Sequence, residues 1–102
     1  MVGNNNVLTN DSDSNDVLGS SNSIDNSDAN NVIGNNAVIT GGSDGNQAFG
    51  NGNVFVNNAD NNRVMGYSNT FDNASTNDVA GNDNLLRAVG AEADAHVDYN
   101  EI

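Results

Sequence analysis

Pairs of apolar residues recur along the chain every 15 or 16 residues, and each pair lies between an asparagine and a glycine. The motif reads Asn, any residue, two apolar residues and Gly, and it is clearest at residues 30–34. Further copies stand at 15–19, 46–50, 62–66 and 77–81. Apolar residues held in register over such a distance indicate a repeat protein rather than a disordered asparagine-rich tract.

The copies align on their glycines, which are Gly3, Gly19, Gly34, Gly50, Gly66 and Gly81. Three positions are then apolar in all six copies: two residues before the glycine, one before it and five after it. The residues one position before the glycine are Val2, Leu18, Ile33, Phe49, Met65 and Ala80. The third position after the glycine is asparagine in every copy except one, where Ala37 stands.

Each copy consists of two similar halves, which we expect to be about five extended residues followed by a short turn. Apolar residues alternate with polar ones, and no stripe of period 3.6 indicates a helix. Asn and Gly tolerate the left-handed backbone of tight corners. The pattern predicts an all-β fold, a parallel β-solenoid over residues 1–87 with about six rungs of 15–16 residues and two short strands per rung. Asparagines in the same column can then bond from rung to rung.

Residues 88–102 depart from the pattern, because asparagine nearly disappears and the next glycine comes half a rung early. We expect this segment to be an irregular rung, a cap or a docking arm. The ends of a solenoid are open strand edges, so a covering segment there would prevent unwanted pairing.

The adjacent apolar residues of each motif cannot both face inward on a regular strand, since successive side chains point to opposite faces. If Val17 and its equivalents face inward, Leu18, Ile33, Phe49 and Met65 form an outward apolar stripe. If Leu18 faces inward, the valine column is exposed instead, and a bulge or corner would bury both. An exposed apolar row usually marks an interface, so we expect self-association, in a homo-oligomer or a filament.

The chain has 14 acidic residues, and its only basic residues are Arg63 and Arg87, which gives a formal charge of −12. This balance argues against nucleic acid and anionic membranes as partners, because both require clustered Lys or Arg. No run is apolar enough for membrane insertion. Cys and Lys are absent and 24 residues are Asn; this composition associates with an extracellular or cell-surface location.

One column of turn residues is acidic, and its members are Asp13, Asp28, Asp44 and Asp60. Carboxylates at rung spacing repel one another, and bound Ca²⁺ would relieve the repulsion with asparagine carbonyls as further ligands. Solvated aspartates that splay apart are the alternative. No other cofactor is expected. His96 is the only histidine, so a zinc site is excluded by count and no catalytic motif is recognisable; we expect no enzyme activity.

The spacing resembles the head repeats of YadA-like trimeric autotransporter adhesins, which carry Asn/Ser-x-apolar-x-Gly followed by small residues three and five positions after the glycine, every 14 to 16 residues. Asn30–Gly34 with Ala37 and Ile39 fits that frame, as does Asn15–Gly19 with Asn22 and Ile24. The resemblance implies a left-handed β-roll, trimer contacts and adhesion to a host or matrix surface. The fifth position is larger here, and no neck, coiled-coil stalk or membrane anchor is recognisable. The asparagine columns also resemble those of curli-type amyloid subunits, whose repeats are longer.

The sequence therefore predicts a non-enzymatic structural repeat protein that self-associates as a subunit of an extracellular fibre or matrix, with the character of a functional amyloid. The alternative is the head fragment of a surface adhesin that binds a host or matrix ligand. Stoichiometry distinguishes the two, because a closed trimer favours the adhesin and open-ended growth favours the fibre.

Overall fold

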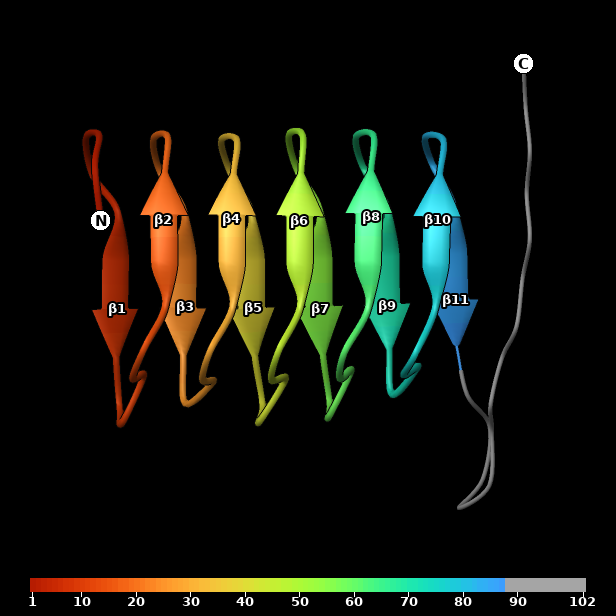
Figure 1. Ribbon diagram of the computed structural model, residues 1–102, viewed down its shortest axis with the longest axis horizontal. Coiled ribbons are helices and arrows are strands. Elements are labelled where there is room, and N and C mark those ends of the chain that lie inside the picture. The colour runs from red at the N-terminus through yellow and green to blue at the C-terminus, as the bar shows by residue number, and fades with distance from the viewer. Residues whose placement is uncertain (88–102) are drawn as a thin grey trace.

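The computed structural model describes residues 1–87, which form a β-solenoid without any helix (Figure 1). The predicted C-terminal segment, residues 88–102, lies outside the described residues. Within residues 1–87, eleven strands of three residues each follow one another. They are β1 (Val7–Thr9), β2 (Asp16–Leu18), β3 (Ser23–Asp25), β4 (Asn31–Ile33), β5 (Val38–Thr40), β6 (Gln47–Phe49), β7 (Val54–Val56), β8 (Arg63–Met65), β9 (Thr70–Asp72), β10 (Asp78–Ala80) and β11 (Leu85–Arg87).

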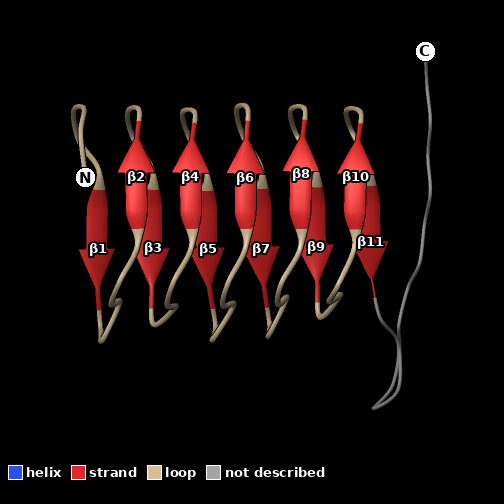
Figure 2. Cartoon of the chain, in the orientation of Figure 1, coloured by secondary structure: helices blue, strands red, loops and turns tan. Residues whose placement is uncertain are grey.

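The strands form two parallel sheets that lie back to back, with turns at both ends of every rung (Figure 2). The five-stranded sheet has the order β10-β8-β6-β4-β2, and the six-stranded sheet has the order β1-β3-β5-β7-β9-β11. Equivalent residues of successive rungs pair in register, as Val17 does with Val32 and Ile24 with Ile39. Val2 extends the five-stranded sheet by a bridge to Leu18. The predicted solenoid with two strands per rung is therefore confirmed.

The strands are shorter than the five extended residues expected per half-rung, because turns with positive φ take up the flanking positions. Among residues 1–87, fifteen residues other than glycine have positive φ, and eight of them are asparagines. One turn column consists of Asn10, Asn26, Gly41, Asn57 and Asn73, with φ between 49° and 71°. Asn and Gly occupy such positions with little strain, so the composition of the chain follows from the number of corners.

The core is a single layer of side chains between the two sheets. The five-stranded sheet contributes the column Val17, Val32, Ala48, Val64 and Val79, and every member is at most 1% exposed. The six-stranded sheet contributes Leu8, Ile24, Ile39, Phe55, Phe71 and Leu86. Phe55 and Phe71 stack with ring centroids 4.7 Å apart and ring planes 5° from parallel. Packing between like residues along the axis therefore replaces the varied packing of a globular core.

Two asparagine ladders flank this core. In the ladder of Asn15, Asn30, Asn46, Asn62 and Asn77, the Oδ1 of each of the first four members accepts the backbone N–H and the side-chain Nδ2–H of the next member. Oδ1 of Asn77, the last member, is buried and has no hydrogen-bond partner among residues 1–87. The donor–acceptor distances lie between 2.8 and 3.1 Å. The second ladder runs through Asn6 and Asn22, is interrupted at Ala37, and resumes at Asn53, Asn69 and Asn84. Buried amides are costly unless they are hydrogen-bonded, so these ladders fix the register of the rungs.

The aligned glycines are required by the close approach of successive rungs. A Cβ at Gly50 would lie 1.8 Å from the carbonyl oxygen of Gly66, and φ of Gly50 is +128°. The same carbonyl accepts Nδ2–H of Asn53 at 3.0 Å. Gly3, Gly19 and Gly66 likewise leave room for a neighbouring carbonyl that accepts a ladder amide.

Candidate functional site

The outer face of the five-stranded sheet carries an uninterrupted apolar row, which we name the apolar stripe. It consists of Val2, Leu18, Ile33, Phe49, Met65 and Ala80, one residue from each rung. Val2 is 64% exposed, Leu18 51%, Ile33 44% and Met65 50%, while Phe49 is half-buried and Ala80 exposed. With rungs about 4.8 Å apart, the stripe is about 24 Å long.

The burial pattern decides between the two orientations that the sequence left open. Each strand of the five-stranded sheet has a buried central residue and outward-facing neighbours. Val17 is 1% exposed and Leu18 is 51% exposed, so the valine column faces inward and the predicted stripe faces outward. A bulge that buries both residues does not occur within the described rungs. Val2 and Ala80 extend the predicted stripe by one rung at each end.

A second outward row, which we name the polar column, runs beside the stripe two residues earlier in each strand. It consists of Asp16, Asn31, Gln47, Arg63 and Asp78. Arg63 pairs with Asp78 of the next rung through Nε, 3.1 Å from Oδ1, and through an Nη. The hydrogen bond from Arg63 holds the pKa of Asp78 below its ordinary value and raises the pKa of Arg63. Both side chains are about half exposed, so the pair contributes little to stability.

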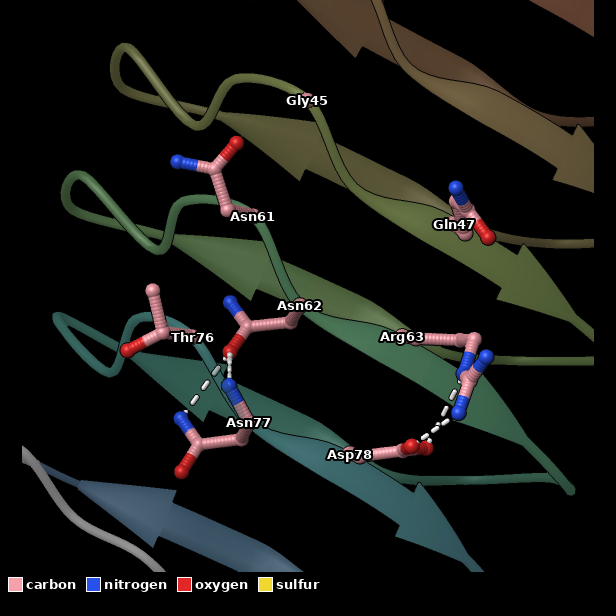
Figure 3. A pocket seen from close by; sticks show the side chains of 8 residues that line it. All are labelled: Gly45, Gln47, Asn61, Asn62, Arg63, Thr76, Asn77 and Asp78. Carbon is pink, nitrogen blue, oxygen red and sulfur yellow. Dashed lines mark hydrogen bonds and ion pairs between the residues drawn. The ribbon is translucent and has the colours of Figure 1, made fainter.

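A shallow hollow lies beside this ion pair, at the corner where the turns enter the five-stranded sheet (Figure 3). Its lining consists of Gly45, Gln47, Asn61, Asn62, Arg63, Thr76, Asn77 and Asp78. Figure 3 shows the Asn62–Asn77 ladder bonds on one side of the hollow and the Arg63–Asp78 pair on the other. Four of the lining residues, Asn62, Arg63, Asn77 and Asp78, are therefore engaged with one another, in the ladder or in the ion pair.

The predicted acidic column lies at the turns, where the carboxylates bond to backbone rather than to one another. Oδ1 of Asp28 accepts the backbone N–H of Asp13 at 2.7 Å, and Oδ1 of Asp44 accepts that of Asp28 at 2.7 Å. Oδ1 of Asp60 accepts the N–H of Asp44 at 2.9 Å. Among residues 1–87, no group of three or more acidic or histidine side chains is placed to hold a metal ion. The calcium hypothesis stays a prediction without a supporting cluster.

The outer face of the six-stranded sheet is more mixed in character. One of its rows is Val7, Ser23, Val38, Val54, Thr70 and Leu85, and the other is Thr9, Asp25, Thr40, Val56, Asp72 and Arg87. Arg87 Nε donates to Asp72 at 2.9 Å. The pKa of Asp72 is lowered chiefly by a hydrogen bond from Asn57 and further by Arg87. Hydroxyl and charged groups interrupt both rows, which leaves the apolar stripe as the continuous apolar feature of the two faces.

His96 belongs to residues 88–102, so the expectation for this side chain falls outside the described residues. Within residues 1–87 there is no helix long and apolar enough to cross a membrane. Comparisons of the chain with protein-family models, with characterised proteins and with solved structures found no match.

Proposed function

We propose that the protein is a non-enzymatic structural subunit of an extracellular fibre or matrix, and that copies associate laterally through the apolar stripe. The observation that carries the proposal is the exposure of this row, which lies in register on the face of the five-stranded sheet. Figure 1 shows the strands of this sheet, β2, β4, β6, β8 and β10, side by side along the solenoid. Monomeric proteins rarely expose such continuous apolar rows, and those that exist usually mark interfaces. The extracellular setting rests on the composition of the chain.

The repeat itself explains why the stripe runs the full length of the solenoid. A core needs only the alternate inward residues of each strand, and the outward position could have been polar in every rung, as the polar column is. Instead it is apolar in all six rungs that contribute to the five-stranded sheet. Burying a half-exposed leucine is worth about 1 kcal/mol by area, so several such residues together supply a useful contact.

The strand edges offer the second contact that a fibre needs. Within the described residues, β1 has a neighbour on one side only. Such an edge presents unpaired backbone groups to another chain. Lateral contact through the stripe and axial contact through the strand edges together give open-ended growth.

Sedimentation velocity over a concentration series tests the lateral contact. Each copy has a formal charge of −12, so the measurement is made at 0.15 M salt or above, where the Debye length is about 8 Å. Leu18→Ser removes one stripe residue from both partners, about 2 kcal/mol in total, so we expect the dissociation constant to rise roughly 30-fold.

Leu85→Ser is the matched control, because Leu85 is 64% exposed on the six-stranded sheet and has the same side chain. We expect this variant to associate like the wild type. Equal association of Leu18→Ser and the wild type, or a wild type that stays monomeric at every concentration, would contradict the proposal.

The alternative, an adhesin head, stays a prediction, and stoichiometry distinguishes it from a fibre subunit. A closed trimer that does not grow further favours the adhesin, and polymers of increasing length, seen by negative-stain electron microscopy, favour the fibre.

A further inference from the structure

We propose that two copies pair face to face through the apolar stripe in an antiparallel register, related by a two-fold axis parallel to the strands, so that Asp16 of each copy faces Arg63 of the other. This inference rests on the proposed function, because it specifies the geometry of the lateral contact. The occupant of the face is thus a second copy of the same chain.

The positions of the two rows follow from the symmetry. A two-fold axis parallel to the strands preserves the position of a residue along its strand and reverses the order of the rungs. The stripe of one copy then meets the stripe of the other, and the polar column meets the polar column. The rungs remain in register because both sheets have the same spacing.

Only one register uses the whole stripe. If the axis passes between the rungs of Ile33 and Phe49, these two residues face each other across the interface. Leu18 then faces Met65, and Val2 faces Ala80. Every large side chain has an apolar partner. The two smallest members of the stripe face each other at the two ends of the interface.

The same register pairs opposite charges in the polar column. Asp16 lies on the rung of Leu18 and Arg63 on the rung of Met65, so they face each other twice in the pair. Asn31 faces Gln47, an amide pair that can exchange hydrogen bonds. Asp78 lies opposite the rung of Val2. Electrostatic complementarity of this kind selects register and orientation.

Neighbouring registers are less favourable. A shift by one rung in one direction places Asp16 opposite Asp78 twice, which sets like charges against each other. A shift in the other direction leaves Ala80 without a partner and separates Asp16 from Arg63. A parallel pair, with the two-fold axis along the solenoid, brings the stripes together but leaves the polar columns on opposite sides.

Arg63 retains the donors that a second carboxylate needs. Its Nε and one Nη are used by Asp78, and a guanidinium has five N–H donors in a planar fork. Arg63 is half exposed on the same face as the stripe, so Asp16 of a second copy can reach the guanidinium N–H groups that Asp78 does not use.

The face is small, and the pair is accordingly dissociable. A strip about 24 Å long and about 10 Å wide on each copy buries on the order of 500 Å² in total, below the 1,200–2,000 Å² of stable interfaces. We therefore expect pairing at high concentration and dissociation on dilution. When the solenoids also stack end to end, several lateral contacts act together, and the combined affinity exceeds that of a single pair.

Single-cysteine variants test the register, because the chain has no native cysteine. Leu18→Cys and Met65→Cys are mixed and treated with a thiol cross-linker about as long as the ~10 Å between packed sheets. The antiparallel register predicts a cross-link between the two variants. Two copies of Leu18→Cys have their cysteines about three rungs, or ~14 Å, apart along the axis, so this variant alone should cross-link poorly.

A charge exchange provides the second measurement. Asp16→Arg and Arg63→Asp should each weaken pairing in sedimentation, and the double variant should restore it at least in part. Asp78→Asn is the control, because it removes the partner of Arg63 within the chain without changing the proposed contact between chains.

The outcomes separate this inference from the proposed function. Cross-linking of Leu18→Cys to itself in place of Met65→Cys, or no rescue by the double variant, overturns the antiparallel register while Leu18→Ser still weakens association. If Leu18→Ser associates as strongly as the wild type, both the proposed function and the antiparallel register are overturned. A Leu18–Met65 cross-link together with charge rescue supports the register.

Discussion

Oδ1 of Asn46 accepts two hydrogen bonds from Asn62 in the next rung, one from the backbone N and one from Nδ2, both at 3.0 Å. Asn46 itself donates in the same way to Asn30. Both side chains are buried, and each accepts hydrogen bonds from the next asparagine and donates to the preceding one. The ladder is a structural element in its own right, and several predictions about stability depend on it.

Replacing Asn46 by alanine should destabilise the protein by about 2–4 kcal/mol, because buried donors of Asn62 lose their acceptor. Gln47→Ala is the control from the adjacent position, whose side chain is exposed, and it should change stability by less than about 0.5 kcal/mol. Chemical denaturation followed by circular dichroism measures both. Equal midpoints for the two variants would show that the ladder contributes nothing.

Replacing Ala37 by asparagine should stabilise the protein by about 1 kcal/mol, because it closes the gap in the second ladder. The backbone N–H of Ala37 already donates to Oδ1 of Asn22 at 2.9 Å, so the main chain is in place. An asparagine adds an acceptor for Asn53, the next member. The free energy of unfolding from urea titration should rise, and a fall would mean that the corner at Ala37 is too tight for an amide.

Replacing Gly50 by alanine should prevent folding or cost more than about 4 kcal/mol, since the new Cβ would lie 1.8 Å from the carbonyl oxygen of Gly66. Gly52→Asn is the control. Its φ is +67°, and Asn5 and Asn36 occupy the same column with φ of 56° and 58°. We expect this variant to keep its melting temperature within a few degrees. Thermal melts of both variants give the comparison.

The stability of the protein should fall below about pH 4, in part because of Asp72. Asn57 and Arg87 lower the pKa of this carboxyl in the folded state. Its contribution is therefore complete above the ordinary value of about 3.9 and is lost as the pH falls through the lower, folded-state value. In Asp72→Asn the acid-induced loss should be smaller. Urea midpoints measured from pH 7 to pH 2 give the two profiles.

Asn57→Gly provides a matched control for this pH dependence, because Gly41 occupies the same turn column with positive φ. Without the donor to Asp72, this variant should also show the smaller loss. An acid profile identical to that of the wild type would mean that other carboxyls carry the pH dependence.

EDTA and added Ca²⁺ should both leave the melting temperature unchanged, because Asp28, Asp44 and Asp60 each direct an oxygen to a backbone N–H of the preceding rung. Differential scanning calorimetry measures the effect. A rise in melting temperature with Ca²⁺ that Asp44→Asn abolishes would instead support the calcium hypothesis.

The surface could be predicted only in part. The sequence placed Leu18 and Ile33 in one column but did not decide whether this column or that of Val17 faces the core, since both are apolar and the choice depends on where each strand begins. The Arg63–Asp78 pair was not predicted, because residues 15 apart become neighbours only when the rungs stack in register. Arg63 and Asp78 hold the same position in successive copies of the repeat, and this equivalence was the sequence signal from which the pair could have been predicted.

What the sequence by itself determined is the repeat, and with it the solenoid, because a rung of 15 or 16 residues cannot fold alone and similar rungs can bury their apolar positions only against one another. The tertiary structure decided which side chains face inward and what they bond to. That choice is a matter of the pleat: in a three-residue strand a shift by one position exchanges core and surface, and the closing turns, the glycine column and the asparagine ladders together hold Val17 inside and Leu18 outside.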